Sequence, residues 1–248
     1  MGYLDKVVDI SELTERNLWV VWGKSNSGKT TLIGSFPKPM IYIMIGDNGA
    51  KSIKHVEGID VIEVNAPSEV VPILEEVYNS KKYKTCVVDT FSLMTQVWID
   101  QNVKSKKKKM TQQLWGDLKD DTDEIIRMAS KLSAKEIVVL TCHEATESIE
   151  GYEDEVTQDV RPSVTKGSRT YLEGMANFGV HTTVISQETE AGTTEVHACH
   201  VGKNPYYWTK AQINPDIKLP KTIKNHTYDK LMKYYNGEVT KKSKKKSK

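Results

Sequence analysis

The chain has 248 residues, a formal net charge of +2 and 38% hydrophobic residues, which fits one large α/β domain with a substantial core. It contains no run of about 18 apolar residues, and its first residues lack the basic-then-apolar pattern of a secretory signal. We therefore expect a soluble, cytoplasmic protein that binds no membrane. Its cysteines, Cys86, Cys142 and Cys199, are expected to be reduced and buried.

The positive charge is concentrated in two places. One lysine run lies between residues 104 and 109 and another in the tail from Lys241 to Lys248, so the rest of the chain is acidic. Such runs stay solvated and often contact polyanions such as nucleic acid. The alternative is a disordered loop and a tail that only aid solubility.

Apolar runs typical of β-strands alternate with helix-like segments. We expect strands at 19–22, 40–45, 60–64, 85–89, 136–142, 181–186 and 194–201, and helices at 29–35, 68–80, 90–103 and 112–133. The alternation predicts an α/β fold with a mostly parallel central sheet and helices on both faces. The last two strands have no helix between them, which predicts a C-terminal antiparallel hairpin that turns near Glu190-Ala191-Gly192.

The C-terminal region is broken up by prolines. Between residues 225 and 237 we expect one short amphipathic helix with Leu231 and Met232 facing inward. The predicted organisation is a single domain over residues 1–237, followed by a disordered lysine-rich tail over residues 238–248.

The segment from Gly23 to Thr30 reads Gly-Lys-Ser-Asn-Ser-Gly-Lys-Thr, a complete phosphate loop between a predicted strand and a predicted helix. Gly23 and Gly28 allow a tight turn in which successive backbone N–H groups converge on phosphates. Lys29 is expected to reach the β- and γ-phosphates, and the Thr30 hydroxyl to bind Mg²⁺. The helix that begins here adds the positive end of its dipole.

Polar residues follow three of the other predicted strands. Asp89 ends one strand and can hold the Mg²⁺ water shell opposite Thr30, or it can cap the next helix. Asp47 follows another strand and can orient the attacking water, or it can simply form a turn. His143 and Glu144 end a third strand. His143 can sense the γ-phosphate or can lie at the surface, and Glu144 competes with Asp47 for the water.

This ordered set resembles the RecA-type recombination ATPases, and more narrowly it is similar to the phage single-strand annealing proteins with a RecA-like core, the fourth type of the Sak group. The resemblance covers about residues 18–205 and includes Ser35-Phe36-Pro37-Lys38-Pro39 before the second strand. It implies ATP and Mg²⁺ as ligands, with Asp47 in the place of the family's catalytic carboxylate and His143 in the place of its nucleotide-sensing glutamine. With Lys29 of the phosphate loop and Glu144 as the rival carboxylate, the candidate catalytic residues are Lys29, Asp47, His143 and Glu144. The implied nucleotide-binding set is Gly23, Lys24, Ser25, Asn26, Ser27, Gly28, Lys29, Thr30, Thr31 and Asp89.

The family has two DNA-contacting loops, which correspond here to residues 101–115 and 144–165. The first contains the lysine run and Trp115, and lysines beside an aromatic ring suit phosphate contact and base stacking. The second has seven acidic residues from Glu144 to Asp159, which leaves basic residues only at or beyond its end. The predicted DNA-binding residues are Lys104, Lys106, Lys107, Lys108, Lys109, Trp115, Arg161, Lys166 and Arg169.

A second role is open for some of these basic residues, because RecA-type sites lie between subunits. Arg161, Lys166, Arg169 and Lys203 could reach a neighbour's nucleotide, and Lys203 is our candidate for that contact. The resemblance also implies a homo-oligomer, either a ring or a filament, and permits a single-strand-binding protein as a partner. If the chain is phage-encoded, its location would be the host cytoplasm.

The sequence thus predicts a DNA-dependent ATPase that binds single-stranded DNA and promotes annealing or strand pairing. Two alternatives stay open at this point. One is a small-substrate P-loop kinase, which would need a basic lid and an acceptor pocket. The other is a non-hydrolysing annealing mediator whose nucleotide only stabilises the fold.

Overall fold

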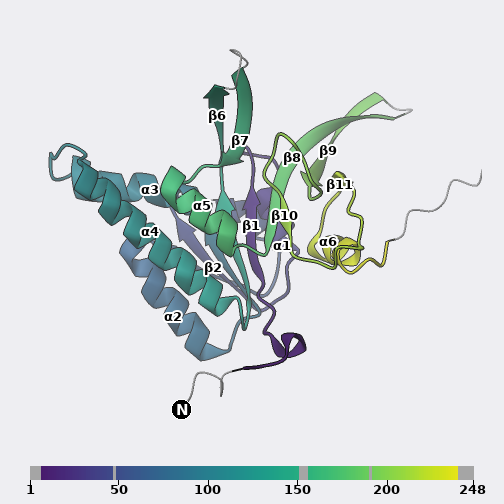
Figure 1. Ribbon diagram of the computed structural model, residues 1–248, viewed down its shortest axis with the longest axis horizontal. Coiled ribbons are helices and arrows are strands. Elements are labelled where there is room, and N and C mark those ends of the chain that lie inside the picture. Colours follow the sequence, from purple (N-terminus) through teal and green to yellow (C-terminus); the bar gives the residue numbers. More distant parts are fainter. Residues whose placement is uncertain (1–6, 47–48, 151–155, 190–191, 240–248) are drawn as a thin grey trace, which may run out of the picture.

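The computed structural model describes residues 7–46, 49–150, 156–189 and 192–239. A central sheet lies between two helical layers (Figure 1). Its main strands run in the spatial order β3 (Ile59–Val64), β2 (Met40–Ile45), β4 (Thr85–Asp89), β5 (Ile137–Cys142), β1 (Leu18–Trp22), β8 (Phe178–Thr189), β9 (Gly192–His200) and β11 (Thr222–Lys224).

The six strands from β3 to β8 are mutually parallel, and β9 and β11 continue the sheet antiparallel. The short strand β10 (Lys210–Ala211) pairs antiparallel with β8. The predicted fold class is confirmed, including the C-terminal hairpin, although its turn residues Glu190 and Ala191 lie outside the described residues.

Side chains of the central strands alternate between two cores, because successive residues of a strand point to opposite faces. Leu18, Val20 and Trp22 of β1 pack beneath one helical layer, and Trp19 and Val21 pack beneath the other. The first layer consists of α2 (Val70–Ser80), α3 (Phe91–Ile99), α4 (Gln112–Leu132) and α5 (Lys166–Met175); the second contains α1 (Lys29–Gly34) and α6 (Tyr228–Tyr235). Leu231 of α6 is buried, as predicted, and Met232 packs against the same core.

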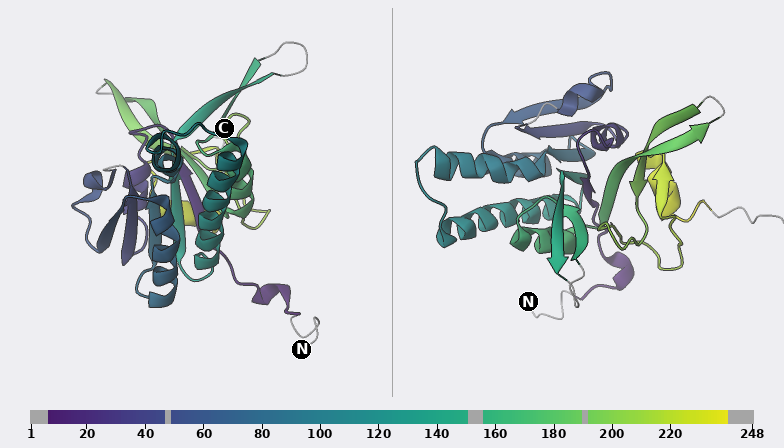
Figure 2. Two further views of the ribbon diagram at one scale, coloured as in Figure 1. Left: turned by 90° about the vertical axis from the view of Figure 1, so that its left-hand side faces the viewer. Right: turned by 90° about the horizontal axis from the view of Figure 1, so that it is seen from above.

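Two hairpins extend beyond the sheet at its carboxyl edge and splay apart (Figure 2). One is β8–β9. The other pairs β6 (Glu144–Glu150) with β7 (Val156–Pro162) as a separate two-stranded sheet. The prediction that residues 144–165 form a loop is therefore wrong over most of their length, because the segment contains the strands β6 and β7. The two strands pair with each other along their described length, and Val160 of β7 also bridges to Tyr207. The first DNA-binding candidate of this segment, Arg161, lies on β7.

Trp19 is the centre of an aromatic cluster on the α1/α6 face. Its side chain is fully buried, its ring stacks on Phe178 with 4.3 Å between centroids, and its edge-to-face contact with Phe36 spans 5.2 Å. Tyr228 and Tyr235 complete the cluster at the C-terminal end of the chain. The cluster therefore fixes α6 against the strand that leads into the phosphate loop.

We expect Trp19→Ala to lower the free energy of unfolding by about 3–5 kcal/mol, because it removes a large buried ring from a packed cluster. Urea denaturation followed by circular dichroism measures this change. Trp115→Ala is the matched control, since that ring is 49% exposed and its removal should change the free energy by about 0.5 kcal/mol or less. Equal losses for the two variants would contradict the assignment.

Candidate functional site

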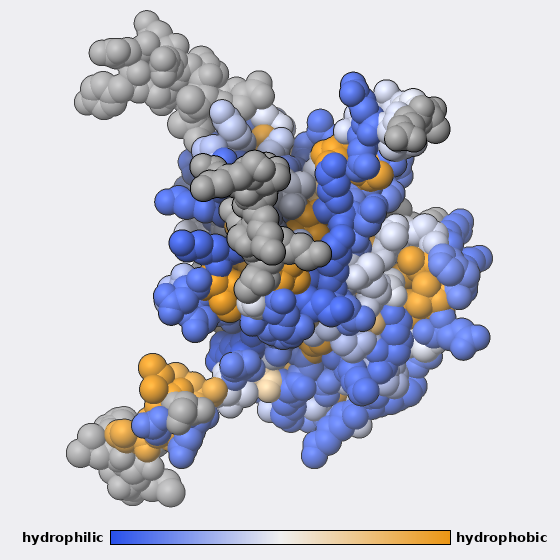
Figure 3. Space-filling model, turned by 90° about the vertical axis from the view of Figure 1, so that its right-hand side faces the viewer, coloured by the Kyte–Doolittle hydropathy of each residue, from blue (hydrophilic) through white to orange (hydrophobic). Residues whose placement is uncertain are grey.

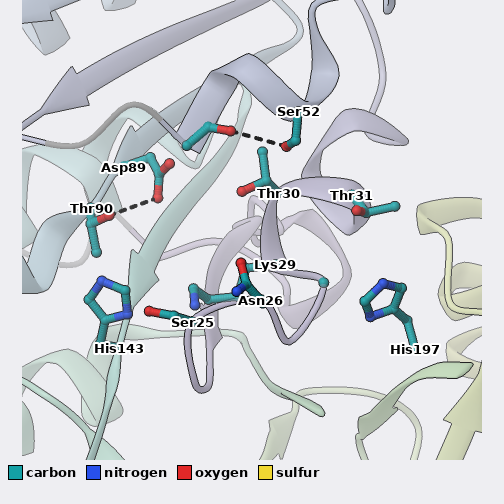
Figure 4. A pocket seen from close by; sticks show the side chains of 12 residues that line it. Ser25, Asn26, Lys29, Thr30, Thr31, Ser52, Asp89, Thr90, His143 and His197 are labelled. Atoms are coloured by element: carbon teal, nitrogen blue, oxygen red, sulfur yellow. Dashed lines mark hydrogen bonds between the residues drawn. The ribbon is translucent and has the colours of Figure 1, made fainter. Parts of the chain in front are cut away.

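A cavity of about 540 Å³ opens where β1 leads into the phosphate loop (Figure 4). It brings together most of the predicted nucleotide-binding residues with Asp89 and His143, whereas Gly23, Lys24 and Ser27 belong to the loop but do not line the cavity. The lining consists of Ser25, Asn26, Gly28, Lys29, Thr30, Thr31, Gly49, Ser52, Asp89, Thr90, His143 and His197.

The phosphate loop is held between two strands of the sheet. The Gly23 N–H donates to the carbonyl of Cys142 at the end of β5, over 3.2 Å. The Ser27 hydroxyl lies 2.6 Å from that of Thr182 on β8. Gly23 has φ +150°, and a Cβ there would lie 2.3 Å from the Thr182 carbonyl oxygen. Only glycine fits this position, which is why the loop can pass so close to β8.

Lys29 lies inside the loop. Its Nζ donates to the carbonyl oxygens of Gly23, at 3.0 Å, and Lys24, at 2.8 Å. The ammonium group is thereby pre-positioned beside the backbone groups that would surround a phosphate. With Thr30 facing the same cavity, this donor set fits a Mg²⁺-bound nucleoside triphosphate, whose metal ion would neutralise phosphate charge.

Asp89 is 4% exposed at the end of β4. Its carboxylate accepts hydrogen bonds from the hydroxyls of Tyr42 on β2 and Thr141 on β5, and from Thr90 at 3.2 Å. The N-cap of α3 is Thr90, so the predicted alternative of Asp89 as the cap does not hold. Its role toward the metal stays a prediction, and its place in the cavity opposite the loop is consistent with that role.

His143 lines the cavity, and its backbone is fixed from two sides. Its N–H donates to the Ser92 hydroxyl of α3 at 3.0 Å, and its carbonyl accepts from the N–H of Ser163, which follows β7, at 2.8 Å. The strand end that carries the predicted sensor is thus attached to α3 and to the segment before α5. Its sensing role stays a prediction.

Asp47 and Glu144 are the two candidates for orienting the attacking water, and the structure describes only Glu144. Asp47 lies outside the described residues. Glu144 does not line the cavity: its carboxylate lies 3.7 Å from Nζ of Lys24 and 3.1 Å from Nε2 of His181. Glu144 therefore connects the phosphate loop to β8, and which carboxylate orients the water stays a prediction.

The predicted DNA-binding residues fall into two groups. The five lysines of the run are exposed at the outer end of the α3–α4 pair, remote from the phosphate loop (Figures 1 and 2), and Lys104 pairs with Asp100 at 2.7 Å. Trp115, Lys166 and Lys203 are also exposed. Arg161 and Arg169 instead form ion pairs within the chain, with Asp159 at 2.7 Å and Glu147 at 2.6 Å.

Sequence reasoning missed several residues of the site. Tyr42 and Thr141 lie inside strands and look like core residues, so only the strand register reveals that they bind Asp89. His197 comes from β9, far along the chain from the motif, and no local pattern marks it as part of the cavity.

Residues 15–206, more than half of the chain, match the protein family described as AAA domain. A search of curated proteins finds no match. None of the helices in the described part of the chain has the length and apolar character needed to cross a membrane. The family match and the cavity agree on nucleotide binding by a P-loop ATPase.

Two buried histidines lie beside the loop. His181 is 3% exposed and stacks on Tyr207 with 4.1 Å between ring centroids; burial lowers its pKa to about 4, although the Glu144 carboxylate opposes that shift. His226 is 5% exposed against the Gly28 backbone, and burial lowers its pKa to about 4 as well. Both rings are therefore neutral in the folded protein near neutral pH.

We expect the free energy of unfolding to fall as the pH drops from about 6.5 to 4. In this window the unfolded chain protonates both histidines, whose ordinary pKa is 6.5, while the folded chain does not. The stabilisation is complete above pH 6.5 and declines by up to about 1.4 kcal/mol per pH unit for each histidine. Urea denaturation at pH 7, 6 and 5 measures it.

The variant His226→Phe should show a shallower pH dependence than the parent protein, because one of the two protonation sites is gone. His55→Phe is the control, since His55 is exposed and its loss should leave the slope unchanged. Identical slopes for His226→Phe and the parent protein would show that His226 does not titrate as described.

Proposed function

The chain belongs to the AAA domain family, and from this premise we propose that it is an ATP-hydrolysing protein that binds single-stranded DNA and promotes its annealing or strand pairing. Nucleotide would bind on Gly23 to Thr30, with Lys29 neutralising phosphate charge and Asp89 facing the metal. The observation that carries the DNA part is a second cavity, which lies on the other side of His143.

The second cavity has a volume of about 730 Å³ and lies among the first turns of α3, α4 and α5. Its lining includes the half-exposed ring of Trp115 together with Lys119, Lys166 and Arg169. These three cations gather at the N-terminus of α5, where the helix dipole is already positive. Asp123 and Glu147 each pair with one of them, so an anion at this helix end would relieve the remaining repulsion.

Buried polar atoms at the start of α5 support an anion site. Among the described residues that line this cavity, the hydroxyl of Thr165 and the Nε of Arg169 have no hydrogen-bond partner. Buried donors without a partner are costly, and phosphate oxygens are suitable acceptors. A phosphate at α5 with a base against Trp115 matches the two contacts that single-stranded DNA makes with proteins, to the backbone and to the base face.

The backbone of His143 links the linings of the two cavities through hydrogen bonds. Ser92 and Ser163 both line the second cavity, and both hydrogen-bond to the backbone of His143, which lines the first. This arrangement supports coupling between nucleotide state and DNA binding, since a shift of the β5 end moves both contacts.

Self-association stays part of the proposal. The N-terminal segment exposes Val7, Val8, Ile10 and Leu13, which are 54% to 82% exposed and appear as a hydrophobic extension of the body in Figure 3. Exposed apolar groups of this kind mark interaction sites. We propose a second copy of the chain as their partner, in a ring or filament where Lys203 would reach a neighbour's nucleotide. A single-strand-binding protein as partner of the lysine tail also stays a proposal.

Lys29→Ala should weaken ATP binding by about 10- to 100-fold, because it removes a hydrogen-bonding charge worth about 1.5–3 kcal/mol. Isothermal titration calorimetry measures the affinity, and Lys218→Ala, at an exposed lysine away from the cavity lining, is the control. Unchanged ATP affinity in the Lys29 variant would overturn the site.

Oligo-dT should stimulate ATP turnover, and DNA affinity should fall steeply as salt rises.

Trp115→Ala should weaken DNA binding by about 1–3 kcal/mol while Trp115→Phe retains it, because stacking needs only an aromatic face. Lys166→Gln should reduce the slope of log affinity against log salt by about 0.7, and Lys218→Gln should leave it unchanged. Fluorescence anisotropy of labelled oligo-dT gives these values.

The same experiments separate the alternatives. Turnover that DNA does not stimulate, with no DNA binding at the second cavity, would favour a small-substrate kinase that uses this cavity for its acceptor. Annealing that persists without ATP and in Asp47→Asn would favour the non-hydrolysing mediator.

A further inference from the structure

His197 is a cavity residue that comes from the C-terminal hairpin. It lies on β9 opposite Val184 of β8, and its carbonyl accepts the N–H of Asn225 at 2.7 Å. These contacts fix the position of the backbone from which the His197 side chain extends. The ring itself is exposed at the mouth of the nucleotide cavity (Figure 4).

The His197 ring lies directly against the phosphate loop. A Cβ on Gly28 would be 2.8 Å from Nδ1 and 3.0 Å from Cγ of this imidazole. Any side chain at position 28 would therefore collide with the ring, in addition to the strain of φ +94° at this glycine. The loop and the histidine are thus fitted to one another within a single chain.

The cavity has two distinct ends. Asp89, Thr90 and His143 lie at one side of the loop, and His197 lies at the opposite side, the side of Thr31 (Figure 4). In a phosphate loop the lysine reaches the β- and γ-phosphates and the metal lies beside them, which assigns the Asp89 side to the terminal phosphates. The nucleoside must then extend toward the other side, where His197 lies.

The lining of the cavity offers few surfaces to a base. Its described residues are small and polar apart from Lys29, Asp89 and the two histidines, and they include no phenylalanine, tyrosine or tryptophan. His143 is at the terminal-phosphate side. His197 is therefore the lining residue that presents a flat aromatic face at the nucleoside end.

We propose that the imidazole ring of His197 stacks on the nucleobase of the bound nucleotide, so that the β8–β9 hairpin closes the nucleotide cavity within the same chain. The inference rests on the nucleotide site of the proposed function and is independent of DNA binding. It adds a base-recognition residue that neither the phosphate-loop motif nor the strand-end carboxylates supply. Because every base has an aromatic face, such stacking accepts different bases.

The test compares two ligands that share phosphates but differ in the nucleoside: Mg²⁺–ATP and Mg²⁺–tripolyphosphate, both titrated by calorimetry into the full chain. His197→Ala should raise the Kd for ATP about tenfold, the effect of losing one base–aromatic stack, and should leave the Kd for tripolyphosphate unchanged. His197→Phe should restore ATP affinity. His55→Ala, at an exposed histidine that does not line the cavity, should bind both ligands like the parent protein.

Three outcomes would overturn the inference. Unchanged ATP affinity in His197→Ala would show that the ring does not contribute to ATP binding. An equal loss for ATP and tripolyphosphate would assign the ring to the phosphates. Failure of His197→Phe to restore affinity would assign it to hydrogen bonding. A parent protein that binds neither ligand would instead overturn the nucleotide site of the proposed function.

Discussion

The carboxylate of Asp89 imposes the constraint on which the site depends. A charged group that is 4% exposed is stable only when hydrogen bonds replace its lost hydration. Those bonds come from Tyr42 on β2 and Thr141 on β5, the strands on either side of β4. The hydrogen bonds of one buried carboxylate therefore tie three adjacent strands together, close to the carboxyl edge of the sheet where the nucleotide cavity opens.

The strand order explains how the remaining groups converge. β5 lies between β4 and β1, so the strand with the buried carboxylate and the strand that enters the phosphate loop are not neighbours. Thr141 on β5 binds Asp89 on one side, and the carbonyl of Cys142, the next residue, binds the Gly23 N–H on the other. The end of β5 is thus bonded both to Asp89 and to the phosphate loop, and His143 follows directly after it.

Local patterns predicted the elements that have a clear period. The strands at 40–45 and 85–89 and the helix at 112–133 were expected almost as they occur, because each has an uninterrupted apolar run or an amphipathic repeat. The β6–β7 hairpin and α5 were not expected. Glu144 to Pro162 is rich in acidic residues, and its strands β6 and β7 form a separate two-stranded sheet, so the segment lacks the apolar pattern that marks a strand of a sheet core.

The sequence predicted those parts of the candidate site that lie within a continuous motif or directly at the end of an apolar strand. The phosphate loop is a contiguous motif, and Asp89 and His143 end apolar strands, so all three were identified from the sequence. Arg169 was predicted only as a DNA-binding or inter-subunit cation. It is 9% exposed and paired with Glu147, a residue of a hairpin that was itself unexpected. Tyr42 and His197 depend on strand register and on the fold of the C-terminal region, which no local pattern encodes.

His143 gives the two cavities a common support. Its N–H and carbonyl groups are bonded to Ser92 and Ser163, which line the second cavity, while its side chain lines the first. A ligand that moves the end of β5 must therefore stretch these bonds or carry α3 and the segment before α5 with it. Because packed elements shift between discrete arrangements rather than deforming continuously, this short hydrogen-bonded connection supports the proposed coupling between the two cavities.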